Sequence, residues 1–176
     1  MPFYPIGNLV STAPKDSGGG YETDLLTLGG EDGFILPVFT SINRLWAFVD
    51  VYLAGDDSIQ PSTFPMNPFE LAEKIEPLEG AGELGFLVFN PTAVTSGQWS
   101  SVNDPIPVAR YCRFMSEIRP GIQQAVREYV ARFGTATPGF AADKEAMERL
   151  GPRIEKLAKS AGARVDEWWE RPGARE

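Results

Sequence analysis

The 176-residue sequence contains no histidine and a single cysteine, Cys112. Histidine is the usual general base near neutral pH, the activating partner of serine and cysteine nucleophiles, and a frequent zinc ligand. Its absence excludes Ser-His and Cys-His catalysis and every zinc site that contains histidine. Cys112 has no partner for an internal disulfide, which agrees with a reducing compartment, and its apolar-polar surroundings favour a buried, inert thiol.

Phosphate-binding glycine motifs are also missing. Glycine is abundant, at 18 residues, but no segment matches the dinucleotide fingerprint or the Gly-Lys-Ser/Thr of a Walker motif. Carboxylate chemistry remains, by paired acids or by Mg2+ or Ca2+ on oxygen ligands; the acids available for it are Asp56, Asp57, Glu70 and Glu83. Because their spacing is not that of a calcium loop, we favour a solvated loop and expect no catalytic residue, metal site or cofactor.

Long hydrophobic runs are absent as well. No apolar stretch approaches the roughly 20 residues that a bilayer-spanning helix needs. The first residues, Met1-Pro-Phe-Tyr-Pro, lack the basic and apolar regions of a signal peptide. We therefore expect a cytoplasmic protein with no membrane partner.

Basic residues are scarce in the first 109 residues, which hold three of them against fourteen acidic residues. Residues 110–142 carry five arginines and two glutamates, and charges balance from residue 143 onward, giving the net charge of −8. An acidic front half repels phosphate backbones, so we expect no nucleic-acid partner, although the arginine cluster is a local exception. The acidity suits a basic protein partner, or it simply keeps the protein soluble.

The N-terminal part of the chain predicts an arm and then a hairpin. Residues 1–21 are rich in Pro, Gly and Ser without a sustained period, which predicts a flexible arm before one globular domain over residues 22–176. Gly29-Gly-Glu-Asp32 separates two apolar segments and predicts a β-hairpin. Pro37 lacks a donor for the ladder, so it indicates an edge strand or a bulge.

Helical periods follow this hairpin. Residues 42–53 place apolar side chains on one stripe, with Thr40 or Ser41 available as the cap. Residues 56–66 read as an acidic, proline-punctuated loop. Asn67-Pro-Phe-Glu70 then forms a capping box that begins a second helix, which Pro77 stops or kinks. The short apolar run Leu84–Phe89 is typical of an interior strand.

The C-terminal part, residues 105–176, predicts an extension of strand, helix, helix and strand. A strand occupies the later part of residues 105–115, a helix begins at Pro120, and a helical pattern continues across Gly151-Pro152 as one kinked helix or two coaxial ones. Residues 163–169 alternate as a strand. Together the patterns predict an α/β or α+β fold, with a single mixed sheet of about four or five strands and amphipathic helices packed on it.

Polar residues follow two of the predicted strands directly. If these strands are neighbours, Thr40, Ser41, Asn90 and Pro91 lie at one rim. Thr40 and Ser41 are also ordinary helix caps, and Asn90-Pro91 is an ordinary turn. Trp99 either binds a partner or packs its loop onto the body, and Trp168 next to Trp169 covers an interface or belongs to the core.

Two segments support a family resemblance. Leu36-Pro-Val-Phe-Thr-Ser41, followed by a helix, and Gly85-Phe-Leu-Val-Phe-Asn-Pro91 resemble the N-terminal domain of the SseB-like family, whose founder is the enhanced serine sensitivity protein. The similarity covers roughly residues 22–95, whereas the loop over residues 56–66 and everything after Asp104 lie outside the matched pattern. The resemblance implies a bacterial, intracellular α/β protein with no agreed reaction or catalytic residues, which points to an accessory or interaction module.

Three hypotheses follow from these patterns. We favour a non-enzymatic module that binds a protein partner, basic in character, through an acidic rim. Its candidate contact residues are Thr40, Asp56, Asp57, Asn90, Trp99 and Trp168. The alternatives are a histidine-free enzyme that uses carboxylates and a divalent metal, and a structural homo-oligomer.

Overall fold

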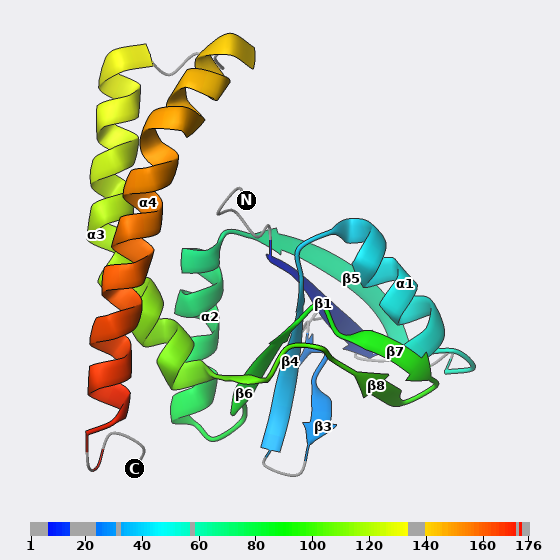
Figure 1. The fold of residues 1–176 in the computed structure, drawn as a ribbon. Helices are drawn as coiled ribbons and strands as arrows, with labels where there is room; N and C mark the ends of the chain where they lie inside the picture. Colours follow the sequence, from blue (N-terminus) through cyan, green and yellow to red (C-terminus); the bar gives the residue numbers. More distant parts are fainter. Residues whose placement is uncertain are drawn as a thin grey trace. The chain divides into compact units, whose positions relative to one another are not determined.

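The computed structural model describes residues 7–14, 24–30, 33–56, 59–133, 140–171 and 173. The chain divides into two compact units, the first within Tyr4–Tyr111 and the second within Cys112–Glu176. The first unit holds the sheet and two helices, and the second holds a long helical hairpin (Figure 1). The long helices pack on each other within the second unit, and the domain bounds predicted from the sequence stay a prediction.

The fold is α+β with a mixed sheet, in agreement with the predicted class. The sheet has seven strands rather than four or five. They are β1 (Gly7–Pro14), β2 (Asp24–Leu25), β3 (Leu28–Gly30), β4 (Gly33–Phe39), β5 (Ile59–Met66), β6 (Phe86–Phe89) and β9 (Ile106–Pro107). Among the described strands β4 and β6 form the one parallel pair, and a separate hairpin joins β7 (Thr92–Thr95) to β8 (Gln98–Ser100).

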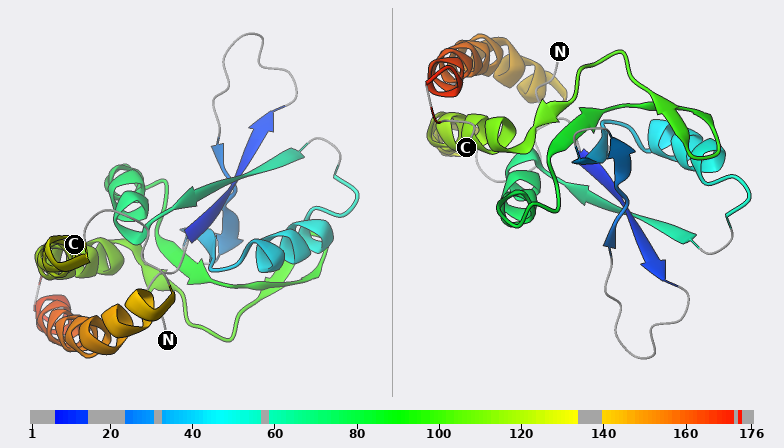
Figure 2. Two further views of the ribbon diagram at one scale, coloured as in Figure 1. Left: turned by 90° about the horizontal axis from the view of Figure 1, so that it is seen from above. Right: turned by 90° about the horizontal axis from the view of Figure 1, so that it is seen from below.

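Strand β5 replaces the acidic loop that was predicted over residues 56–66. It pairs antiparallel with β1 along all eight residues, and the ladder joins it to no other described strand (Figure 2). Pro61 and Pro65 are an even number of residues apart, so their nitrogens face the same side of the strand. An edge strand needs ladder donors on one side only, and the two prolines are therefore compatible with β5.

Strand β1 corrects part of the predicted flexible arm. Gly7–Pro14 pairs with β5 on one side and with β2 and β4 on the other. The strands that pair with Gly7–Pro14 lie far from it in the sequence, so no local hydrophobic periodicity predicts this strand. The other residues of the predicted arm lie outside the described ranges.

The predicted hairpin is confirmed, because β3 and β4 pair antiparallel from Leu28↔Ile35 to Gly30↔Gly33. Pro37, however, does not mark an edge strand, since β4 lies between β6 on one side and β3 and β1 on the other. The carbonyls of Phe34 and Val38 accept hydrogen bonds from the β6 side, so the Pro37 nitrogen faces the opposite side. On that side of β4, the pairing with β3 ends at Ile35 and the pairing with β1 begins at Val38. Pro37 lies between these two paired segments, so neither neighbouring strand needs its missing N–H.

Helix α1 (Ile42–Tyr52) turns one aromatic side toward the sheet. Leu45, Phe48 and Val49 are buried, and the Phe48 ring lies 5.2 Å from that of Phe39 and 4.9 Å from that of Tyr52. Trp46 belongs to the apolar stripe predicted over residues 42–53, but its side chain is 39% exposed. In both views of Figure 2, α1 lies beside the β7–β8 hairpin.

Helix α2 (Pro68–Gly80) begins as predicted. The Asn67 side chain accepts from the backbone N–H of Phe69 and Glu70, and the Glu70 carboxylate accepts from the Asn67 N–H at 2.9 Å. Pro77 does not stop the helix, which continues to Gly80. A proline in the last turn removes a single intrahelical hydrogen bond, so the cost is small enough for the helix to continue.

The core of the first unit lies between these helices and the sheet. Its largest fully buried side chains are Phe39, Phe48, Leu28, Leu36, Leu45, Leu71, Ile75, Leu87, Val38 and Val88. Most of them come from β4, β6 and the inner faces of α1 and α2. Both strands that end at the predicted rim are therefore held rigidly by apolar packing.

Helix α3 (Val108–Phe133) begins earlier than the sequence predicted. The strand predicted in the later part of residues 105–115 is wrong, because α3 covers that part and β9 lies before it. Pro120 lies inside the helix. Val108, Tyr111 and Ile118 are buried at helical spacing and continue into Ala125, so a single stripe covers both segments. Cys112 in this helix is half-buried.

Helix α4 (Phe140–Trp169) runs through Gly151-Pro152 and through the predicted strand over residues 163–169. Ala161 and Val165 are buried four residues apart, which is helical spacing. The alternation over residues 163–169 was misleading, because burial against α3 outweighs the strand preference of Val165 and the tryptophans. None of the described helices is long and apolar enough to cross a membrane.

Ion pairs join α3 and α4 on one side of the hairpin. Arg164 Nε donates to Glu117 Oε2 at 2.9 Å, and Arg153 donates to both carboxylate oxygens of Glu128. The two glutamates lie eleven residues apart on α3, and their arginine partners lie eleven residues apart in the opposite direction on α4, as antiparallel helices require. Eleven residues are close to three full turns, so both pairs lie on the same side.

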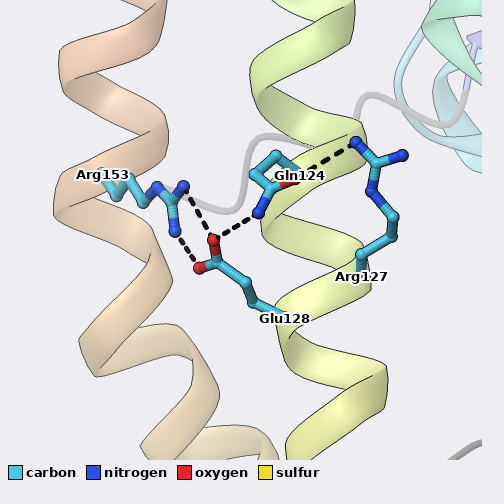
Figure 3. Close-up of polar contacts among 4 residues, drawn as sticks. All are labelled: Gln124, Arg127, Glu128 and Arg153. Atoms are coloured by element: carbon cyan, nitrogen blue, oxygen red, sulfur yellow. Dashed lines mark hydrogen bonds and ion pairs between the residues drawn. The ribbon is translucent and has the colours of Figure 1, made fainter.

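The Glu128 pair is the centre of a small polar network (Figure 3). Gln124 donates to Glu128 at 2.8 Å, and Arg127 donates to Gln124 at 3.1 Å. The hydrogen bond from Arg153, and then that from Gln124, holds the pKa of the Glu128 carboxyl below its ordinary value.

Replacing Arg153 by glutamine should raise the pKa of Glu128 toward its ordinary value. Because the pKa is lowered in the folded protein, the pair contributes stability above the ordinary glutamate pKa of about 4.3 and loses it as the pH falls through the lowered value. Carbon-13 titration of the Glu128 carboxyl measures the shift, with Lys156→Gln as the control on α4. An identical titration in wild type and Arg153→Gln would contradict the assignment.

Candidate functional site

The two strands predicted to share a rim are parallel neighbours. Strands β4 and β6 pair in register from Ile35↔Phe86 to Val38↔Phe89, so the residues after them lie at the same edge. The backbone N–H of Thr40 donates to Asn90 Oδ1 at 2.9 Å, and the Thr40 hydroxyl lies 3.2 Å from the same oxygen. The sequence prediction that these residues meet is confirmed.

Asn90 has an unusual backbone conformation for a residue with a side chain. Its φ is +51°, in the left-handed region, which asparagine tolerates better than most residues do. Its N–H donates to the Val38 carbonyl at 2.8 Å, while Asn103 Nδ2 donates to the carbonyl of Phe89 at 3.1 Å. Asn90 therefore connects the ends of both parallel strands.

Neither hydroxyl acts as the predicted helix cap. Ser41 occupies the N-cap position of α1, but its side chain makes no capping hydrogen bond. The Thr40 hydroxyl is directed to Asn90 instead. Thr40 thus ties β4 to β6, and the capping interpretation is wrong for both residues.

Replacing Asn90 by alanine should lower the free energy of unfolding by about 1–2 kcal/mol. The change removes the acceptor of the Thr40 N–H and places a non-glycine residue without a stabilising amide at positive φ. Asn90→Gly removes the same acceptor without the backbone strain, so its loss should be smaller. Urea denaturation of both variants measures the difference, and equal losses would mean that the backbone conformation contributes nothing.

A pocket of about 190 Å3 opens beside this connection. It is lined by Arg44, Ala47, Phe48, Asn90, Pro91, Thr92 and Ala93. Helix α1 supplies one wall, and the segment that leads from β6 into β7 supplies the other. The pocket therefore lies at the carboxyl ends of the parallel strands, where open α/β sheets bind ligands.

Among the candidate contact residues, neither Asp56 nor Trp99 is placed with Thr40 and Asn90. Asp56 is exposed and follows the C-terminal end of α1, whereas Thr40 precedes its start. The helix has 11 residues, which corresponds to about 16 Å of length. Asp57 lies outside the described residues. Trp99 is half-buried and packs against the core of the first unit, as the alternative interpretation had it.

Trp168 lies in the other unit, on α4. Its ring is 5.7 Å from that of Trp169, and the Arg113 guanidinium lies 5.6 Å from its centroid. Both contacts are within the helical hairpin, where Arg113 also pairs with Glu117 at 3.1 Å. The predicted contact set is thus divided between two units.

Two features of the first unit were not predicted from the sequence. Arg44 lines the pocket, and the available signal was that it is one of three basic residues in the first 109, four positions after Thr40. Exposed carboxylates also gather at the end of α2, where Glu76 and Glu79 lie within the helix and Glu83 follows it. In the described part of the chain, no three acidic or cysteine side chains converge as metal ligands would.

The chain was compared with known protein families, curated proteins and solved structures. No protein-family model, no curated protein and no solved structure matches the chain.

Proposed function

We propose that the chain is a non-enzymatic accessory module that binds a basic protein partner through the acidic surface of its first unit. The observation that carries this proposal is the set of exposed carboxylates at the C-terminal end of α2. The resemblance to the SseB-like family supports an accessory role, and the complete absence of histidine makes catalysis by common mechanisms unavailable.

The first unit carries all of the excess negative charge. Residues 4–111 hold 14 acidic and 4 basic residues, a balance of −10, whereas residues 112–176 hold 10 acidic and 12 basic ones, a balance of +2. A surface of one sign steers an oppositely charged partner and raises its association rate. The first unit is therefore the side toward which a basic partner would be drawn.

The end of α2 is an unfavourable place for acids. The carbonyl end of a helix is its negative end, where acidic side chains are destabilising. Glu76 and Glu79 lie in the last turns of α2, with no basic residue in the last turn. Among the described residues neither makes an ion pair. Acids retained at a cost in stability suggest a role in recognition.

Replacing Glu76 and Glu79 together by glutamine should therefore stabilise the protein while weakening association. We expect the free energy of unfolding to rise by about 0.5 kcal/mol. The partner is first captured from cytoplasm at low salt. Its rate of association with the double variant should be several-fold lower than with the wild type. Stopped-flow kinetics across a salt series measures the rate, which should also fall as salt screens the charges.

A matched control separates position from net charge. Glu167 and Glu170 are exposed acids of the second unit, and their double replacement by glutamine changes the net charge equally. This control should retain the wild-type association rate. An equal loss in both double variants, or an association rate that salt does not change, would contradict the proposal.

Self-association is a second candidate function, favoured by apolar side chains left open on the helical hairpin. Val126 and Val130 of α3 are 46% and 38% exposed and lie four residues apart on one stripe. Light scattering of the wild type and of Val126→Ser with Val130→Ser tests it. A monomeric mass of the wild type over the micromolar range would exclude this candidate.

A further inference from the structure

We infer that the pocket between α1 and β7 binds a carboxylate carried on a small apolar body. This inference is independent of the proposed basic partner, since it concerns a ligand of the opposite charge. Three features of the pocket lead to it: an arginine without a carboxylate partner, an asparagine that presents only donors, and apolar walls of limited size.

Arg44 supplies the positive charge. Its side chain is exposed at the pocket, and no acid within the described ranges forms an ion pair with it. Arg44 is one of four basic residues in a unit that carries fourteen acidic ones. The guanidinium offers five N–H donors in a planar fork, which fits the two oxygens of a carboxylate.

Asn90 adds donors from a second wall of the pocket. The backbone N–H of Thr40 can only donate, so the Asn90 atom 2.9 Å away must be the amide oxygen. The amide NH2 group consequently remains, and it donates no hydrogen bond to any of the described residues. The hydroxyl of Thr92, another lining residue, makes no hydrogen bond in the described structure. Arg44 and the Asn90 amide supply donors, and the Thr92 hydroxyl can donate as well as accept, so these groups favour an acceptor or an anion.

The remaining walls are apolar. Ala47, Phe48, Pro91 and Ala93 complete the lining. The volume of about 190 Å3 is below the roughly 300–1,000 Å3 of pockets that hold drug-sized ligands, so the ligand is small. A phosphate group would leave its oxygens against these apolar walls. A carboxylate with a short branched aliphatic chain fits both the donors and the walls.

The first experiment titrates 3-methylbutanoate and its neutral amide, 3-methylbutanamide, into the full-length protein. Chemical shifts of the Asn90 side-chain NH2, the Arg44 Nε–H and the Ala93 backbone amide report on the pocket. We expect saturable shifts with the acid in the millimolar range and at least tenfold weaker binding of the amide.

Two variants test the parts of the pocket separately. Arg44→Gln should weaken binding of the acid at least tenfold, and because Arg44 is exposed without an ion-pair partner in the described structure, its melting temperature should match wild type. Ala47→Leu fills the pocket and retains Arg44, so it should abolish binding as well. Lys74→Gln removes a positive charge elsewhere in the same unit and should bind like wild type.

A second arm identifies the source of the carboxylate. The acetylated tripeptide Gly-Ala-Val is titrated with a free and with an amidated C-terminus. Tighter binding of the free peptide than of 3-methylbutanoate assigns the pocket to a protein C-terminus, and binding of 3-methylbutanoate alone assigns it to a free small acid. Both outcomes support the inference.

Three results would overturn it: no saturable shift with either acid, equal affinity of the acid and its amide, or wild-type affinity in Arg44→Gln. Unlike failure of the proposed protein interaction, these results involve neither α2 nor a partner protein. The two proposals can therefore fail separately.

Discussion

Replacing Phe48 by alanine should lower the free energy of unfolding by about 3–5 kcal/mol, the largest effect we expect from a single substitution. Phe48 is 2% exposed and contacts the rings of Phe39 and Tyr52 on either side. Alanine would remove most of this buried surface and leave a cavity between α1 and β4. Urea denaturation monitored by circular dichroism measures the loss.

Trp46 provides the matched control on the same helix. Its side chain is 39% exposed, so Trp46→Ala should cost well under half as much. Tyr52 gives a second measurement, because burial raises the pKa of its phenol. In Phe48→Ala the phenol should gain access to water and its pKa should fall toward the ordinary value. A loss of stability no larger than that of Trp46→Ala would mean that α1 is not anchored by this ring.

Gly121→Val should lower the free energy of unfolding by about 1–3 kcal/mol, because the added side chain displaces that of Leu157 within the helical hairpin. A β-carbon at position 121 would lie 2.7 Å from Cδ1 and 3.2 Å from Cγ of Leu157. The backbone fixes the position of a β-carbon, so no rotation of the valine side chain relieves this contact, and Leu157 has to move instead. The same substitution at Gly162, where a β-carbon meets no atom within 4 Å, should cost little.

A double-mutant cycle tests whether Leu157 is the cause. Leu157→Ala alone creates a space, and in the Gly121→Val background that space accepts the new methyl groups. The double variant should therefore be more stable than the sum of the two single losses predicts, by about 1 kcal/mol. Additive losses would mean that the valine acts through another neighbour.

The part of the fold that could be predicted from the sequence is the part encoded by local signals. Asn67 and Glu70 define a helix start by their chemistry alone, and Gly30 and Gly33 flank a hairpin turn. The apolar runs of β4 and β6 indicated buried strands, and the polar residues that follow them indicated where their ends meet. Each of these signals depends on neighbours within a few positions.

The elements that were missed depend on distant partners. Strand β5 contains Pro61 and Pro65, which argue against a strand until its edge position beside β1 is known. Helix α4 continues past Gly162 because Val165 is buried in the hairpin, and no property of residues 163–169 by themselves shows this. Tertiary packing overrides local preference in both cases.

For the candidate site, the meeting of the two strand ends could be predicted from the sequence, but the positive charge of Arg44 beside them could not. Thr40 and Asn90 were predicted together because both follow apolar strands. Arg44 was missed because it stands on the exposed side of a helix, where an arginine is ordinary until the pocket beside it is seen. Asp56 was grouped with them although a whole helix intervenes in the chain.

The prolines of β5 also bear on how the protein behaves at high concentration. A foreign chain that tried to extend the sheet beyond β5 would find no amide hydrogen at Pro61 or Pro65. Two rungs of any intermolecular cross-β ladder would be lost within one eight-residue strand. Pro61 and Pro65, which argue against a strand in the sequence, thus also disfavour fibril growth at the edge formed by β5.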